Sequence, residues 1–94
     1  MKELTLDIIN KLGLHARAAS KLTRLCASFN STIIFSKVTD GELKNSADGK
    51  NIMALMLLAA GKGTQLHLRC EGDDAEQALE AITQLFADRF GESE

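Results

Sequence analysis

The sequence of 94 residues contains no tryptophan, no tyrosine and no proline, and only four phenylalanines. So few aromatic side chains disfavour functions that stack nucleic-acid bases, including a small RNA-binding domain. The formal net charge of −2 gives no overall attraction to nucleic acid or to an anionic membrane. The longest apolar run, Ile52 to Ala60, is about half as long as a membrane-spanning helix. We therefore predict neither a nucleic-acid partner nor membrane insertion.

Cysteine is also scarce, because the chain has only Cys26 and Cys70, without CxxC spacing. This usage favours a reducing compartment and disfavours a disulfide scaffold. No signal peptide precedes the alternating residues near the start, so we expect a cytoplasmic protein. His15 and His67 are far apart in the sequence and both cysteines are predicted to point inward, which makes a poor zinc site. We predict no metal and no cofactor.

What the chain does have is a hydrophobic content of 45%, enough for one packed domain over residues 1–94. Residues 91–94 are polar and are expected to form a frayed tail. Residues with period-two alternation or with many β-branched and aromatic side chains predict strands at 4–8, 32–38, 42–47 and 65–71. Asp40-Gly41 predicts a hairpin turn, and Leu43 is expected to face the core. Helical spacing of apolar residues starts at Ala16 and again near residue 75.

The run Ile52 to Ala60 is apolar nearly all round, so its length alone does not separate a buried strand from a short helix. Met, Ala and Leu dominate it, which favours a helix that Asn51 caps and Gly61 stops. The order is then β-α-β-β-α-β-α. This order predicts an α+β fold, an open-faced sandwich in which three helices cover one face of a four-stranded antiparallel sheet.

The candidate site is Gly13-Leu14-His15-Ala16-Arg17-Ala18-Ala19, in which a histidine precedes a helical pattern. The first amides of a helix have no intrahelical partner and form a positive end that binds anions. By position alone, His15 is equally well explained as a phosphoryl acceptor or as a residue that merely ends a loop. Arg17 favours the acceptor, because a guanidinium in the first turn can pair with phosphate oxygens. The amides of Ala16 and Arg17 would stabilise the same group.

A second candidate surface lies on the predicted helix that begins at Ile52. One short helix cannot bury all of its apolar residues on one side, so Leu55 and Leu58 are expected in the core. Ile52, Met53 and Met56 are then left near the surface, where methionines suit a docking patch. The alternative is that all of them fill the core.

These motifs resemble the HPr family of phosphocarrier proteins of the phosphoenolpyruvate-dependent phosphotransferase system. The likeness rests on Gly13 to Ala19, on Lys50 to Met56 and on Ala60 to Gly63, and the element order agrees. The resemblance implies that enzyme I phosphorylates His15 on Nδ1 and that an EIIA-type domain receives the phosphoryl group. It also implies an active-site role for Arg17 and a docking role for Ile52, Met53 and Met56. We expect a monomeric carrier with a transient phosphohistidine rather than a stand-alone enzyme.

Three departures from the family pattern stand out. Ala18 replaces the usual proline, which a first helical turn tolerates. Asn51 occupies the position of the regulatory serine found in many members, which puts serine regulation there in doubt. The segment from Lys37 to Asn45 is longer than usual, so its hairpin is expected to project. Ala18 and the run from Ala54 to Gly63 are similar to the nitrogen-type branch (NPr), and the sequence leaves the sugar-type and nitrogen-type branches open. The alternative function is a regulatory interaction module on the same fold that is not phosphorylated.

Overall fold

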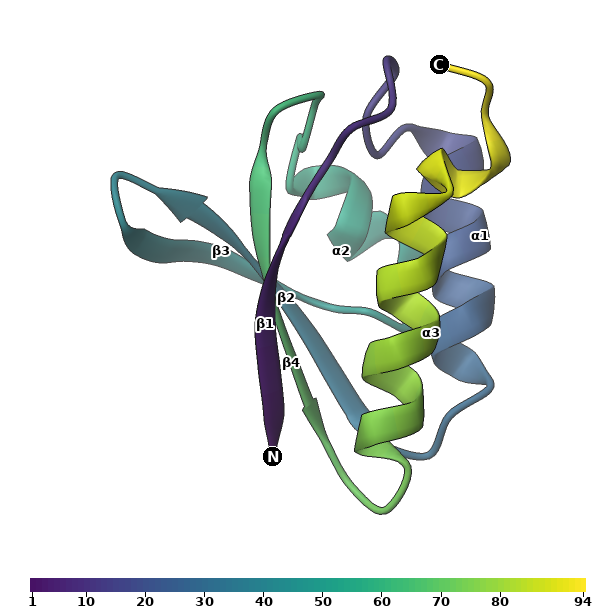
Figure 1. Cartoon of the computed structure of the whole chain (residues 1–94). Coiled ribbons are helices and arrows are strands. Elements are labelled where there is room, and N and C mark those ends of the chain that lie inside the picture. The colour runs from purple at the N-terminus through teal and green to yellow at the C-terminus, as the bar shows by residue number, and fades with distance from the viewer.

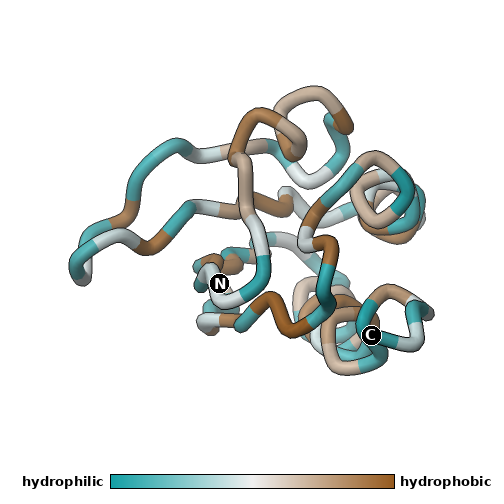
Figure 2. The backbone as a smooth tube through the Cα atoms, turned by 90° about the horizontal axis from the view of Figure 1, so that it is seen from above, coloured by the Kyte–Doolittle hydropathy of each residue, from teal (hydrophilic) through white to brown (hydrophobic).

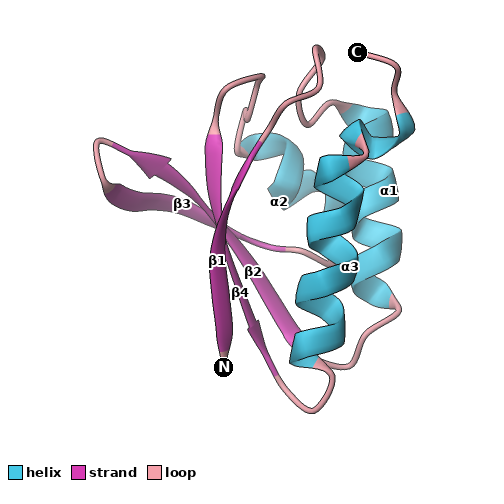
Figure 3. Ribbon diagram, viewed as in Figure 1, coloured by secondary structure: helices cyan, strands magenta, loops and turns pink.

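A four-stranded antiparallel sheet carries three helices on one face in the computed structural model, which describes all residues 1–94 (Figures 1 and 3). The elements in chain order are β1 (Lys2–Asp7), α1 (Ala16–Ala27), β2 (Thr32–Thr39), β3 (Glu42–Asp48), α2 (Ile52–Leu57), β4 (Gln65–Glu71), α3 (Ala75–Ala87) and a final 3-10 turn (Arg89–Gly91). The predicted fold class and element order are confirmed. None of the helices combines the length and the apolar character needed to cross a bilayer.

The strands lie in the order β1-β4-β2-β3, and every neighbouring pair is antiparallel. Strand β4 lies between β1 and β2, and its alternation decides which way its side chains point. As predicted, Leu66, Leu68 and Cys70 are buried beneath the helices. The other face of the sheet carries polar side chains, including His67 and Arg69.

The core between the sheet and the helices contains three of the four phenylalanines. The Phe86 ring from α3 stacks on Phe35 of β2 with centroids 6.1 Å apart. Phe90, beyond the end of α3, tilts against Phe86 at 4.9 Å. Because Phe90 is almost completely buried, it fixes the last residues of the chain to the body of the domain.

The β2–β3 hairpin projects away from the helices, as predicted for the segment from Lys37 to Asn45 (Figures 1 and 2). Asp40 and Gly41 at its turn both have positive φ, of 50° and 79°, the pattern of a type I′ hairpin turn. The expectation that Leu43 faces the core is wrong, because Leu43 is exposed. The pairing register slips by one residue between Phe35 and Lys37, and a slip of one residue moves side chains to the opposite face.

Helix α2 forms where the apolar run predicts a helix, and the Asn51 side chain caps it by accepting a hydrogen bond from the Ala54 amide at 3.1 Å. Its predicted end is wrong. The helix stops at Leu57 instead of continuing to Ala60, and Ala59 adopts a left-handed conformation with φ of 51°. This reversal turns the chain so that the Ala60 carbonyl accepts the Leu14 amide at 2.8 Å. A tertiary contact therefore decides where α2 ends.

Residues 91–94 also differ from the frayed tail that their polarity predicts. The Lys11 amide donates to the Glu94 main-chain oxygen at 2.9 Å, and the Glu92 side chain is only 15% exposed. The segment lies beside the loop that joins β1 to α1, near the start of α1 (Figure 1). The fold thus brings the first loop and the last residues of the chain together.

Candidate functional site

The loop before α1 is fastened to the loop after α2 by a close backbone contact. Gly13 has φ of 67°, and a Cβ atom at this position would stand 2.6 Å from the Ala60 carbonyl oxygen and 2.7 Å from the Gly61 Cα. Only glycine fits both the conformation and the space. The next residue, Leu14, is buried and donates its amide to Ala60. This anchor sets the position of His15.

His15 lies at the N-cap of α1 with extended backbone, φ of −75° and ψ of 179°. Its carbonyl accepts the Ala19 amide at 2.8 Å, but its side chain makes no capping hydrogen bond. The amides of Ala16 and Arg17 precede this first helical bond and therefore lack an intrahelical partner. The arrangement leaves the imidazole free for another role beside the positive end of the helix.

The side chain of His15 forms its hydrogen bond with a residue that is distant in the sequence. His15 Nε2 is hydrogen-bonded to Glu92 Oε2, from 77 residues away. The other oxygen of Glu92 accepts the side-chain amide of Asn10 at 3.0 Å, and Asn10 also donates to the Gly13 carbonyl at 2.8 Å. The hydrogen bonds from His15 and Asn10 hold the pKa of Glu92 below its ordinary value. Sequence reasoning missed both residues, since neither a loop asparagine nor a tail glutamate forms a local motif.

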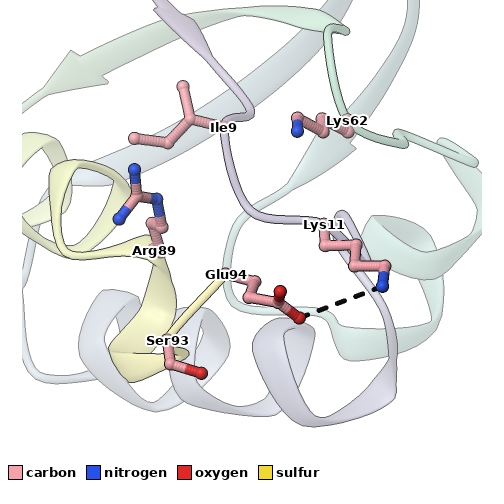
Figure 4. Close-up of a pocket in the computed structure, with 6 residues that line it drawn as sticks. All are labelled: Ile9, Lys11, Lys62, Arg89, Ser93 and Glu94. Atoms are coloured by element: carbon pink, nitrogen blue, oxygen red, sulfur yellow. Dashed lines mark ion pairs between the residues drawn. The ribbon is translucent and has the colours of Figure 1, made fainter.

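Arg17 lies on the exposed surface in the first turn of α1, and no carboxylate pairs with it. With Glu92 and Leu12 it lines an open hollow of about 330 Å³. A neighbouring hollow of about 360 Å³ lies around the tail and contains Lys62 and Arg89 (Figure 4). Lys11, which lines both hollows, pairs with Glu94 at 3.9 Å. Of the basic residues beside Glu92 in the first hollow, Lys11 is paired with Glu94, whereas Arg17 has no acidic partner and is free to meet an anion.

The apolar residues at α2 divide between core and surface as predicted, except that Ile52 is only partly exposed. Leu55 and Leu58 are buried, whereas Met53 is 64% exposed and Met56 is also exposed. Ile52 is half-buried against the core. Sequence reasoning missed Leu57, which is 80% exposed, and Leu12 of the first loop, which is 65% exposed. The helix, which packs against α1, leaves an apolar surface uncovered, so the reading of all these residues as core filler is wrong.

His67 takes no part in this arrangement. It lies on the helix-free face of the sheet, where its Nε2 atom is 3.1 Å from Glu3 Oε1. No group of three or more His, Cys, Asp or Glu side chains gathers in a way that could hold a metal ion. The free thiols of Cys26 and Cys70 are buried, and burial raises the pKa of the Cys26 thiol to about 12. His15 is thus the histidine with anion-binding groups around it.

Comparison with known proteins places these residues in a wider context. Residues 2–88 match the family model described as the PTS HPr component phosphorylation site. The phosphocarrier protein HPr of Pseudomonas aeruginosa is 45% identical over 94 residues, all of both chains. The phosphocarrier protein NPr of Shewanella violacea is 41% identical over 91 residues, which cover 97% of this chain and 94% of that protein. Among solved structures, HPr-C-His from Thermoanaerobacter tengcongensis superimposes with a TM-score of 0.89 at 37% identity, over all of both chains.

Proposed function

The chain belongs to the HPr family of phosphocarrier proteins of the phosphotransferase system, and from this premise we propose that His15 is its phosphoryl acceptor. The observation that carries the proposal is the placement of His15 at the N-cap of α1, with its ring not used as a cap. Residues 1–94 act as one carrier domain, as a cytoplasmic monomer. The family implies phosphorylated enzyme I as the donor and an EIIA-type domain as the receiver.

The transfer itself is an in-line exchange at phosphorus. The lone pair of His15 Nδ1 forms the new bond to phosphorus while the bond to the donor breaks, and onward transfer reverses these roles. Positioning and charge stabilisation carry most of the catalysis, because the carrier adds no general acid or base. The amides of Ala16 and Arg17 receive the phosphoryl oxygens, and the unpaired guanidinium of Arg17 balances their charge.

The exposed apolar surface of α2 is the proposed docking site for both partners. It consists of the exposed Met53 and Met56 and the half-buried Ile52, which the sequence indicates; Leu57 and, on the first loop, Leu12 are exposed as well. Flexible methionines can fit more than one partner surface. A carrier that meets a donor and a receiver in turn needs such a surface.

Labelling with enzyme I and radioactive phosphoenolpyruvate tests the acceptor. Wild type should gain acid-labile, base-stable label, His15→Ala should gain none, and the matched control His67→Ala should be labelled like wild type. Unchanged labelling of His15→Ala would remove His15 from this role. The same assay with each enzyme I paralogue, of the sugar-type and the nitrogen-type system, assigns the branch by the faster donor.

The roles of Arg17 and the docking surface are tested with variants that keep the fold. Arg17→Ala should slow transfer about 10- to 100-fold, the loss of a charge-assisted hydrogen bond, while Arg24→Ala at the other end of α1 should not. Met53→Glu should weaken binding to enzyme I, whereas Leu43→Glu, an exposed leucine on the hairpin, should not. Equal rates for the two arginine variants, or equal affinities for the two glutamate variants, would contradict the corresponding role.

A further inference from the structure

The segment after α3 has an unusual backbone that aims it at His15. Arg89, Phe90 and Gly91 have consecutive positive φ values of 56°, 54° and 80°. Non-glycine residues in this region cost about 1–3 kcal/mol each and persist only where the surroundings enforce them. Here the buried ring of Phe90 and a 2.7 Å hydrogen bond from Lys21 Nζ to the Phe90 carbonyl hold the kink. The kinked backbone fixes the direction in which the tail continues beyond α3.

Because the tail runs in this direction, Glu92 reaches the His15 imidazole, and both of its carboxylate oxygens form hydrogen bonds. One oxygen accepts from His15 Nε2, and the other accepts from the Asn10 side-chain nitrogen. Asn10 is completely buried, and its second N–H bonds to the Gly13 carbonyl. Both partners of this nitrogen are oxygens, so the amide has one possible orientation. Glu92 is therefore fixed from a buried support rather than resting loosely on the surface.

The chemistry of a carboxylate decides which ring nitrogen carries the proton. An ionised carboxylate only accepts hydrogen bonds, and the lowered pKa of Glu92 keeps it ionised at neutral pH. His15 Nε2 must then be the donor. In a neutral imidazole the other nitrogen, Nδ1, is left with its lone pair. The hydrogen bond made by one ring nitrogen thus sets the state of the other.

We propose that Glu92 is a positioning residue that holds the His15 ring in the Nε2–H tautomer and so presents Nδ1 as the nucleophile. This rests on the proposed function, in which Nδ1 accepts the phosphoryl group. The charged groups that face this pair are Arg17 and Lys21 of α1, Lys11 of the preceding loop and Glu94 of the tail.

The same contact serves the phosphorylated state. When Nδ1 bonds to phosphorus and Nε2 keeps its proton, the ring is formally cationic, and the Glu92 carboxylate stabilises that charge. During onward transfer the electrons of the P–N bond return to Nδ1, and the ring is restored as the same tautomer. The Nε2 proton never leaves the ring, so neither direction of transfer needs a proton shuttle.

Ring-nitrogen NMR on the unphosphorylated protein tests this inference without any partner. At a pH where the ring is neutral, wild type should show protonated Nε2 and unprotonated Nδ1. In Glu92→Ala the ratio of Nε2–H to Nδ1–H tautomers should fall about tenfold, the effect of one charge-assisted hydrogen bond. Glu92→Gln retains an acceptor and should fall between the two. The control Glu94→Gln removes a neighbouring charge and should match wild type.

Transfer kinetics supply the second measurement. Glu92→Ala should lower kcat with enzyme I while leaving KM unchanged, because the apolar surface of α2 is intact. A wild-type tautomer ratio in a folded Glu92→Ala protein would overturn the inference. Failure of wild type to accept label would instead overturn the proposed function, and the tautomer measurement would be unaffected by that result.

Discussion

Gly13 offers a quantitative test of how the His15 loop is held, through the substitution Gly13→Ala. Two costs add at this position. An alanine in a left-handed conformation costs about 1–2 kcal/mol, and the added Cβ would lie 2.6 Å from the Ala60 carbonyl oxygen. The loop must therefore move away, which breaks the hydrogen bond from Leu14 to Ala60 at a cost of about 1–3 kcal/mol. The sum is about 2–5 kcal/mol.

Two other glycines provide matched controls. Gly41 has φ of 79° and nothing within 4 Å of an added Cβ, so Gly41→Ala should show only the conformational cost, about 1 kcal/mol. Gly61 has neither a positive φ nor a neighbour within 4 Å, so Gly61→Ala should be neutral or slightly stabilising. The three variants separate the close contact from the backbone conformation.

The measurement is urea unfolding of the three variants and wild type, followed by circular dichroism. A domain of this size has a stability of about 5–10 kcal/mol, so even Gly13→Ala remains measurable. We expect Gly13→Ala to be the least stable by about 2 kcal/mol relative to Gly41→Ala. Equal losses in these two variants would refute the tight contact between the loops. The Gly13 variant should also accept phosphoryl groups more slowly, because His15 is displaced.

Three further predictions concern stability and reactivity. Ala59→Gly should stabilise the protein by about 1 kcal/mol in urea unfolding, because it removes an alanine from a left-handed conformation. The control Ala54→Gly, inside α2, should destabilise the protein by about the same amount. A loss of stability in both variants would contradict the argument. The thiol of Cys26, whose pKa burial raises to about 12, should resist alkylation at about pH 8 until the protein is unfolded, and fast labelling of the native protein would count against its burial. The pKa of Asp74 is lowered, first by the hydrogen bond from the Ser31 hydroxyl. The ionised carboxylate therefore stabilises the fold at pH values above the ordinary pKa of aspartate, and this stabilisation is lost as the pH falls below about 4. Unfolding measured against pH should consequently be less acid-sensitive in Asp74→Asn, and an identical profile would remove this carboxylate from the acid transition.

The sequence is enough to predict most elements of this fold because their signals are local. Alternation places Leu66, Leu68 and Cys70 on the buried side of β4, and the structure agrees. The candidate site around Gly13 and His15 is recognisable for the same reason, since a turn residue and the start of a helix lie within a few positions of each other. The exposed methionines of α2 also follow from a local count, because a short helix has too many apolar residues for one buried side.

Only the tertiary structure decided the features that depend on distant parts of the chain. Leu43 faces outward because pairing with β2 slips by one residue, and a slip inverts the faces of a strand whatever its composition. Helix α2 ends early because the chain turns so that the Ala60 carbonyl can accept the Leu14 amide of the loop before α1. The contact between Glu92 and His15 spans 77 residues and depends on a kink that is held by the buried ring of Phe90. No local pattern encodes such a contact, because the chain must first close its core before these two side chains can meet.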